Sequence, residues 1–384
     1  MVRPRRTLSI LLVALLCAAG PADARKVRPG RVLGATPLTA QVLPGVAMPG
    51  SAWRVVYRST TATGTPTRVS GTILVPENRA AGNPLIGYAI GTQGLADRCA
   101  PSAQLAAGSE YEAALVEAVL EQGWTVALTD YPGLGTRGRH PYVVGRALGP
   151  AVLDSMRAAR NLPAAGVPRH GPAAIMGYSE GGGAAGWAIQ LQPRYAPDIP
   201  LTAAAVGGVV ADLPRIGASL DGSPYAFLLG YTLDGFDAAY PKLRLAQYLN
   251  AKGRELIAKL RDTCVFDAIG SYPFGHAADL TTRDIFTLPA FQRVMARNSL
   301  GTIAPQTPVF LQHARLDQIL PYDQAVALKD QWCALGVHVT FADAVGADHI
   351  TGGVGASAPA IAYLAARLAG EPPPATSCEL PSQP

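Results

Sequence analysis

One five-residue segment, Gly177-Tyr178-Ser179-Glu180-Gly181, constrains the fold of this chain more than any other. It has the pattern G-x-S-x-G, with a short apolar run (172–176) before it and a run of small residues (182–191) after it. This order predicts a buried strand, a sharp turn and a tightly packed helix, which is the setting of a nucleophilic serine. The serine backbone is strained in such a turn, and the flanking glycines keep bulk away from it.

Chance matches to this pattern are expected in a chain with 41 glycines among 384 residues, so the flanking elements carry the inference. In the predicted turn, the Ser179 hydroxyl lies above the sheet edge and the backbone N–H of Glu180 points into the same space. An N–H there can bind the negative oxygen that forms when a serine attacks a carbonyl. The alternative is a glycine-rich loop without chemistry.

The first 24 residues have the organisation of an export signal. A basic segment with three arginines precedes an apolar run (8–19) that is too short to span a bilayer comfortably. Ala22-Asp23-Ala24 then forms an A-x-A cleavage site. The sequence therefore predicts a secreted protein whose mature chain begins at Arg25, with no transmembrane segment in that mature chain.

Four cysteines remain after this cleavage. An even number in an exported protein predicts two disulfides, for which three connectivities exist, whereas buried free thiols are the alternative. No cluster of cysteine and histidine indicates a metal site, and no cofactor is implied. The four residues are Cys99, Cys264, Cys333 and Cys378.

The charge argues against a nucleic-acid partner. The formal net charge is +5, and segment 1–24 contributes three Arg and one Asp, so the mature chain carries about +3. Such a weak and scattered positive charge does not form a nucleic-acid surface.

Strands and helices are expected to alternate along most of the chain, which predicts a parallel, doubly wound α/β sheet. The predicted strands are 52–59, 68–76, 84–90, 124–128, 172–176, 201–210, 308–313 and 337–342; the predicted helices are 111–122, 149–161, 182–191, 322–335 and 358–368. From residue 212 to 305 the alternation stops, and an amphipathic helix is expected near 249–260. We therefore expect a core made of 25–211 and 306–384, with a helical cap of 212–305 inserted over the sheet edge.

The expected cap contains an apolar stretch, Tyr225-Ala226-Phe227-Leu228-Leu229, with no obvious sheet to cover. A soluble protein rarely leaves such a patch in water. Phe227 and Leu228 either line an acyl-binding pocket over the serine, which we favour, or pack as core.

A serine hydroxyl needs a base, and the base needs an acid to orient it. His349 follows the last predicted strand at the correct sheet end, whereas the other five histidines precede the serine, lie in the cap or fall inside strands. Asp317 follows the preceding strand and is the favoured acid. Its rival, Asp323, has the position of a residue at the start of a helix.

The second donor to the oxyanion is expected in the loop Gly91-Thr92-Gln93-Gly94, after an early strand. Gln93 or Gly94 could present a backbone N–H there, and Gln93 could add its side-chain amide. The alternative is that this loop is a turn without a role in binding the oxyanion.

With these residues placed, the chain resembles the secretory lipase family. The similar segments are Cys99-Ala100-Pro101-Ser102, Gly177-Tyr178-Ser179, Leu249-Asn250-Ala251-Lys252-Gly253, Ser271-Tyr272-Pro273-Phe274, Asp317-Gln318-Ile319-Leu320-Pro321-Tyr322 and Asp348-His349-Ile350-Thr351. The resemblance implies an α/β-hydrolase fold with a helical cap, and it supports Asp317 and His349 as acid and base. It also implies the disulfides Cys99–Cys264 and Cys333–Cys378. Gly94 departs from the family, whose fungal members usually carry an acidic oxyanion donor at that position.

The sequence therefore predicts a secreted serine carboxylic-ester hydrolase, a lipase that cleaves triacylglycerol or other acyl esters through an acyl-enzyme intermediate. Its partner is expected to be a small-molecule acyl ester or lipid, with contact to a lipid interface. The alternatives are an acyltransferase that uses the same three residues and an inactive hydrolase fold that binds a partner.

Overall fold

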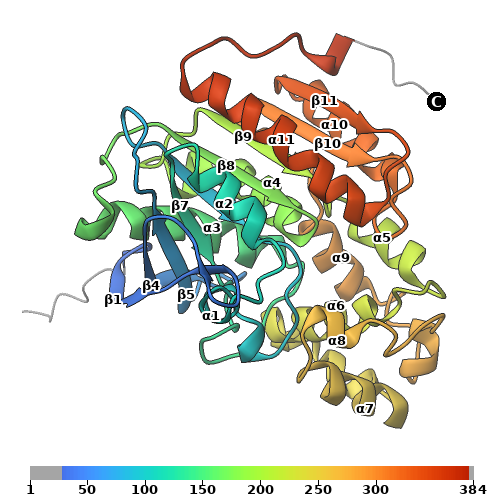
Figure 1. Cartoon of the computed structure of the whole chain (residues 1–384). Coiled ribbons are helices and arrows are strands. Elements are labelled where there is room, and N and C mark those ends of the chain that lie inside the picture. The colour runs from blue at the N-terminus through green and yellow to red at the C-terminus, as the bar shows by residue number, and fades with distance from the viewer. Residues whose placement is uncertain (1–27, 380–384) are drawn as a thin grey trace, which may run out of the picture.

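A nine-stranded sheet forms the centre of the molecule, in the order β1-β4-β5-β7-β6-β8-β9-β10-β11 (Figure 1). The computed structural model describes residues 28–379, so the predicted export signal and its cleavage site lie outside the described residues. The pairs from β1 to β7 are antiparallel, and all later pairs are parallel. This confirms the predicted α/β-hydrolase fold with a mostly parallel sheet.

The bounds of the sheet strands are β1 (Val32–Leu38), β4 (Ser51–Thr60), β5 (Pro66–Val75), β6 (Leu85–Ala89), β7 (Thr125–Thr129), β8 (Ala173–Tyr178), β9 (Ala203–Gly207), β10 (Val309–Ala314) and β11 (Val339–Ala344). A separate two-stranded sheet pairs β2 (Gln41–Leu43) with β3 (Val46–Ala47). The central strands β6, β7, β8 and β9 are buried along their whole length or nearly so, which explains why they appear as apolar runs in the sequence.

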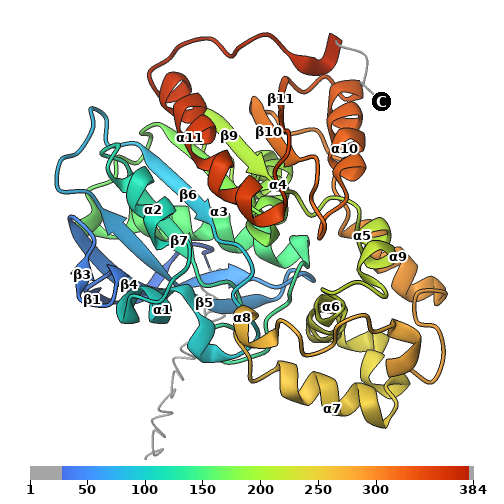
Figure 2. The same ribbon diagram turned by 45° about the vertical axis from the view of Figure 1, so that its right-hand side comes forward.

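Helices cover both faces of the sheet. One layer contains α3 (Gly145–Asn161), α4 (Glu180–Tyr195) and α10 (Tyr322–Ala334), and the other contains α2 (Ala113–Leu120) and α11 (His349–Leu368) (Figures 1 and 2). In the first layer, the Trp332 indole donates to Gln190 Oε1 at 3.1 Å and joins α10 to α4. The short helix α1 (Pro101–Ala107) follows the loop after β6.

Several elements differ from the sequence prediction, among them β1 and α11. Strand β1 was not expected, because it is an exposed edge strand whose residues show no buried face. Helix α11 begins at His349, nine residues before its predicted start at 358. Gly352, Gly353 and Gly355 lower the helix propensity of this first part. Close packing explains the glycine at position 352, because a Cβ there would lie 2.7 Å from the Ala314 Cβ.

Between β9 and β10 the described chain forms helices and no sheet strand. The helices are α5 (Leu213–Leu220), α6 (Phe227–Ala239), α7 (Ala251–Leu260), α8 (Val265–Ala268) and α9 (Pro289–Arg297). Figures 1 and 2 show them together on one side of the sheet. Their apolar side chains form a hydrophobic cluster separate from the core around the sheet. None of the helices in the described residues is long and apolar enough to cross a membrane.

Candidate active site

Ser179 sits at the sharp turn between β8 and α4, with φ 59° and ψ −124°. This left-handed conformation is costly for a residue with a side chain, and the surrounding contacts maintain it. A Cβ at Gly177 would lie 2.4 Å from the Gly181 carbonyl oxygen, and one at Gly181 would lie 2.0 Å from that of Ala89. Both glycines of the motif are therefore required by close backbone approach.

His349 lies within hydrogen-bond distance of both Ser179 and Asp317, the two residues expected to act with it. The Nε2 atom of His349 is 2.9 Å from the Ser179 hydroxyl, and its Nδ1 atom is 2.7 Å from Oδ2 of Asp317. Asp317 follows β10, and His349 is the first residue of α11. Ser179 is partly exposed, whereas the side chain of Asp317 is fully buried. This geometry allows the imidazole to accept the serine proton while the carboxylate orients it.

Hydrogen bonds keep the buried Asp317 carboxylate ionised. Burial alone would raise its pKa, but hydrogen bonds from His313 and His349 outweigh that effect and lower the pKa well below its ordinary value. Oδ1 accepts the N–H groups of Ile319 and Leu320 at 3.0 and 2.7 Å. The acid is therefore a carboxylate over the whole pH range in which proteins normally work.

His313 lies next to the acid. From the sequence it was assigned only to the interior of a strand. Its Nε2 atom lies 2.9 Å from the Leu320 carbonyl oxygen and 3.3 Å from Oδ2 of Asp317. Its side chain is completely buried in β10. In the sequence, the only indication of this contact was the spacing of four residues between His313 and Asp317, across the end of a strand.

The backbone of His349 is held at both of its polar groups. The Tyr178 hydroxyl donates to the His349 carbonyl oxygen at 2.8 Å, and the His349 N–H donates to Oε1 of Gln318 at 3.0 Å. Gln318 also donates from Nε2 to the Tyr225 hydroxyl at 3.2 Å, which links the base to the segment before α6.

Three other acidic residues near these strand ends, including the rival Asp323, have different roles. Asp323 lies in the first turn of α10, as predicted, and forms an ion pair with Arg215 at 3.0 Å. Asp343 pairs with Arg315, and Asp348 caps α11 by accepting the Thr351 N–H. None of the three contacts His349 in the way that Asp317 does.

Among residues 28–379, the backbone N–H groups of Glu180, Gln93 and Gly94 are not engaged in a hydrogen bond. The Glu180 N–H is free because it belongs to the first residue of a helix. The side-chain amide of Gln93, however, is engaged elsewhere. Its Nε2 atom donates to Glu110 Oε1 at 3.1 Å, and its Oε1 atom accepts from Gln104. The backbone of the loop, rather than that amide, is the candidate second donor.

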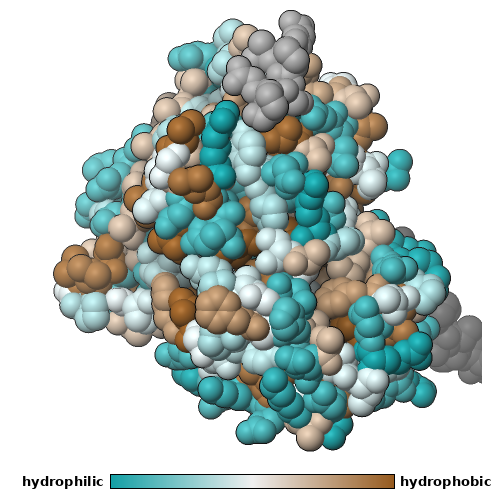
Figure 3. All heavy atoms as spheres, turned by 90° about the vertical axis from the view of Figure 1, so that its right-hand side faces the viewer, coloured by the Kyte–Doolittle hydropathy of each residue, from teal (hydrophilic) through white to brown (hydrophobic). Residues whose placement is uncertain are grey.

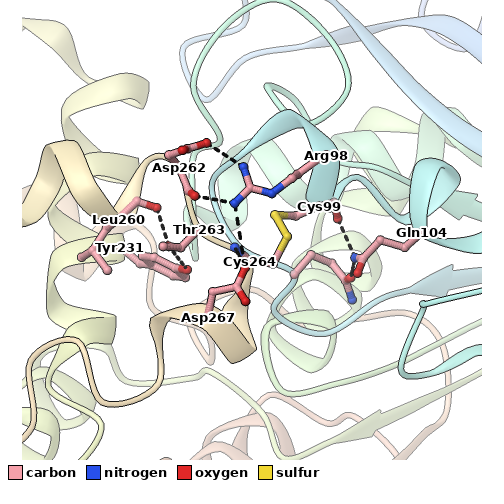
Figure 4. Close-up of a disulfide and its surroundings, with 10 residues drawn as sticks. Arg98, Cys99, Gln104, Tyr231, Leu260, Asp262, Thr263, Cys264 and Asp267 are labelled. Carbon is pink, nitrogen blue, oxygen red and sulfur yellow. Dashed lines mark hydrogen bonds and ion pairs between the residues drawn. A yellow bond between two sulfur atoms is a disulfide. The ribbon is translucent and has the colours of Figure 1, made fainter. Parts of the chain in front are cut away.

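The loop that carries Gln93 and Gly94 is tied to the helical segment between β9 and β10. The Val265 N–H donates to the Gln93 carbonyl oxygen at 2.9 Å, and a Cβ at Gly94 would lie 2.5 Å from the Thr263 carbonyl oxygen. The disulfide Cys99–Cys264 closes the same junction (Figure 4), and the second disulfide joins Cys333 to Cys378. Figure 4 also shows Arg98 bound to Asp262 and Asp267 across this junction.

Two buried carboxyl groups lie behind this loop. Glu112 accepts the Gly91 N–H and the Tyr88 hydroxyl, both at 2.8 Å. Glu110 Oε2 is buried and has no partner among the described residues. Burial and the nearby charge of Glu112 raise the pKa of Glu110 from 4.5 to about 8.

Replacing Glu110 with glutamine is expected to stabilise the protein at pH 7–8. Between pH 4.5 and about 8 the folded state binds a proton at Glu110 that the unfolded state has lost, so stability falls as pH rises through this window. The slope is at most about 1.4 kcal/mol per pH unit. Urea unfolding from pH 5 to 9 measures it. The exposed Glu121→Gln variant is the control, and an unchanged slope in Glu110→Gln would contradict the prediction.

The remaining predicted positions are buried. Phe227 and Leu228 begin α6 and are 2% and 6% exposed, within the second hydrophobic cluster. The Phe227 ring packs against Tyr231 with centroids 5.6 Å apart. In the part of the chain that the structure describes, no group of three or more histidine, cysteine or acidic side chains could hold a metal ion.

Fold and site together define the α/β-hydrolase class, with serine, acid and histidine in that chain order. The chain belongs to the secretory lipase family, whose model matches residues 100–376. A secreted triacylglycerol lipase of Malassezia furfur, LIP5, is 30% identical over 72% of this chain and 75% of its own length. A Mycobacterium tuberculosis protein named probable inactive lipase MT1628 is 29% identical over 92% of this chain and 81% of its own.

Solved structures agree on the fold. Lipase A of Candida antarctica superposes with a TM-score of 0.82 at 23% identity, covering 90% of this chain and 84% of its own. The esterase LipA of Xanthomonas oryzae reaches a TM-score of 0.71 at 21% identity, over 89% of this chain and 97% of its own. The family assignment supports a hydrolase of the lipase and esterase type.

Proposed function

We propose that this protein is a secreted serine hydrolase that cleaves carboxylic esters of fatty acids through an acyl-enzyme intermediate. The observation that carries the proposal is the continuous hydrogen-bonded series Ser179–His349–Asp317, with distances of 2.9 and 2.7 Å. The family, with its secreted relatives, and the two disulfides support an extracellular setting.

In this mechanism the Ser179 oxygen attacks the ester carbonyl carbon while His349 Nε2 accepts its proton. The Glu180 N–H and the backbone of the 93–94 loop stabilise the oxyanion. The imidazolium then gives the proton to the leaving alcohol. Water repeats the sequence on the acyl-enzyme and releases the acid. Asp317 remains ionised throughout and stabilises the charged imidazole.

The name of the mycobacterial relative makes activity the first question to test. An inactive hydrolase fold does not need a strained serine or an oriented imidazole, yet both are present here. The purified protein should react with a fluorophosphonate at Ser179 and hydrolyse p-nitrophenyl esters in buffer without an added alcohol. Failure to label would favour a binding protein, and ester cleavage only with an alcohol acceptor would favour an acyltransferase.

Exposed apolar side chains close to the acid and the base support a lipid-like substrate. Leu316 and Ile350 adjoin Asp317 and His349 in the chain and are both 62% exposed, and Val354 follows one helical turn later at 63%. Figure 3 shows apolar patches separated by polar side chains on the face of the molecule that it presents. We take these three side chains as the candidate contacts for an acyl chain or a lipid surface.

Truncation of Phe227 or Leu228 tests whether α6 shapes acyl selectivity. If these side chains line the acyl site, Phe227→Ala and Leu228→Ala shift the preference along a C2-to-C16 series of p-nitrophenyl esters and retain cleavage of short esters. Their burial also predicts a loss of stability of about 2–5 kcal/mol. Melting temperatures measured beside the ester series separate the two effects. Destabilised variants with an unchanged preference would assign both residues to the core alone.

A further inference from the structure

A buried histidine–glutamate pair lies beside the nucleophile, and the proposed mechanism does not use it. The Nε2 atom of His140 is 2.8 Å from Oε1 of Glu180, and each side chain is 1% exposed. Glu180 is the residue after Ser179, and its own N–H is expected to bind the oxyanion. His140 comes from the loop between β7 and α3, 40 residues earlier in the chain.

The hydrogen bonds of His140 determine how many protons the pair holds. Its Nδ1 atom is 3.3 Å from the Pro132 carbonyl oxygen, which can only accept, so Nδ1 carries a hydrogen. The contact between Nε2 and Oε1 then requires a second proton between those two atoms. With a hydrogen at each ring nitrogen, the imidazole can balance the charge of the Glu180 carboxylate.

No other cation is available to Glu180 among the neighbours of this ring. Tyr131 stacks on His140 with centroids 5.7 Å apart, and Tyr142 approaches it edge-on at 6.0 Å. Burial and the Glu180 carboxylate raise the pKa of both phenols, so both stay neutral. The adjacent Arg139 is already bound by Asp234 and Asp237, at 2.6 and 2.9 Å.

A carboxylate without a partner at this position would oppose the reaction. Its charge would lie in a region of low dielectric, on the same residue whose N–H faces the developing oxyanion. Like charges in such a region repel strongly, and the repulsion would be greatest in the transition state.

We propose that His140 is the charge-balancing partner of Glu180, and that it allows an acidic side chain to follow the nucleophile without repelling the oxyanion. The proposal rests on the hydrolase function proposed above. His140 does not touch the substrate, so it is a positioning residue that acts through Glu180.

The test compares four proteins: wild type, His140→Gln, Glu180→Gln and the double variant. Glutamine at position 140 can still donate to Glu180 but carries no charge, whereas glutamine at 180 removes the charge that needs a partner. We expect His140→Gln to lower kcat on p-nitrophenyl butyrate by about 30-fold or more, with KM within about 2-fold. The double variant should regain at least about 10-fold of the kcat that His140→Gln loses, because removing the carboxylate removes the charge that lacks a partner.

The rescue in the double variant separates charge balance from a structural role. If His140 only packs, the double variant will be as impaired as His140→Gln or more so, which overturns the proposal. Equal losses in Glu180→Gln and His140→Gln would also overturn it. His338→Gln is the matched control, because His338 also contacts a carbonyl oxygen, that of Pro374, but lies on the surface.

Two further measurements keep the outcomes distinct. Fluorophosphonate labelling of the wild type is done first, since a wild type that does not label contradicts the proposed function rather than the pairing. Urea unfolding of the four proteins then tests the pairing itself. Charge balance predicts that Glu180→Gln restores stability, or folding, to a chain that carries His140→Gln, and additive losses would refute it.

Discussion

Replacement of Ser179 by alanine is expected to abolish ester cleavage while leaving the fold intact. The hydroxyl is the atom that would bond to the acyl carbon, and no other side chain can replace it. Loss of the nucleophile from a set of this kind typically lowers kcat by about 10⁶-fold. Alanine at this turn keeps the close approach of the flanking glycines, so the melting temperature should change little.

Purified Ser179→Ala protein is assayed with p-nitrophenyl esters and a fluorophosphonate probe. Ser109→Ala is the matched control, because Ser109 is exposed and lies outside the site. A Ser179→Ala protein that keeps a tenth of wild-type activity would show that another residue is the nucleophile.

The second large effect is expected at the acid. Asp317→Asn should lower kcat by about 10⁴-fold, because an amide nitrogen next to Nδ1 of His349 favours the wrong tautomer of the imidazole. Two backbone N–H groups bind Oδ1 of Asp317, and they should hold the amide oxygen in the same place. KM is therefore expected to change much less than kcat.

Asp323→Asn provides the matched comparison for the acid. It also removes one negative charge, but from the start of α10, where the Asp323 side chain is 60% exposed and pairs with Arg215. Its activity should stay within about 2-fold of wild type, since exposed ion pairs contribute little. The reverse ranking of the two variants would move the acid to Asp323.

The residues that the structure brings together at Ser179 were predictable because their signals are local. The strand–turn–helix pattern around Ser179 and the strand exits before Asp317 and His349 can each be recognised in a short window of sequence. The central strands were predictable for the same reason, since burial on both faces leaves an uninterrupted apolar run.

The rest depends on how the folded chain brings side chains together, or on elements that carry no hydrophobic pattern. His140 meets Glu180 across 40 residues, and its role in a pair is invisible until the two loops are placed. His313 meets Asp317 because a strand end and a turn fold back on each other. The early start of α11 depends on Gly352 packing against β10, which outweighs the low helix propensity of the glycines. The edge strand β1 has no buried face and so no hydrophobic period.

The disulfide between Cys99 and Cys264 limits how the helical segment between β9 and β10 can move. It fixes the junction of α7 and α8 to the chain just after the 93–94 loop, and backbone hydrogen bonds of Gln93 and Leu95 reinforce that attachment. If this segment opens to admit a substrate, the junction must serve as the hinge. The displacement would then be largest at the helices farthest from Cys264, and the N–H groups of the 93–94 loop would stay in place in both states.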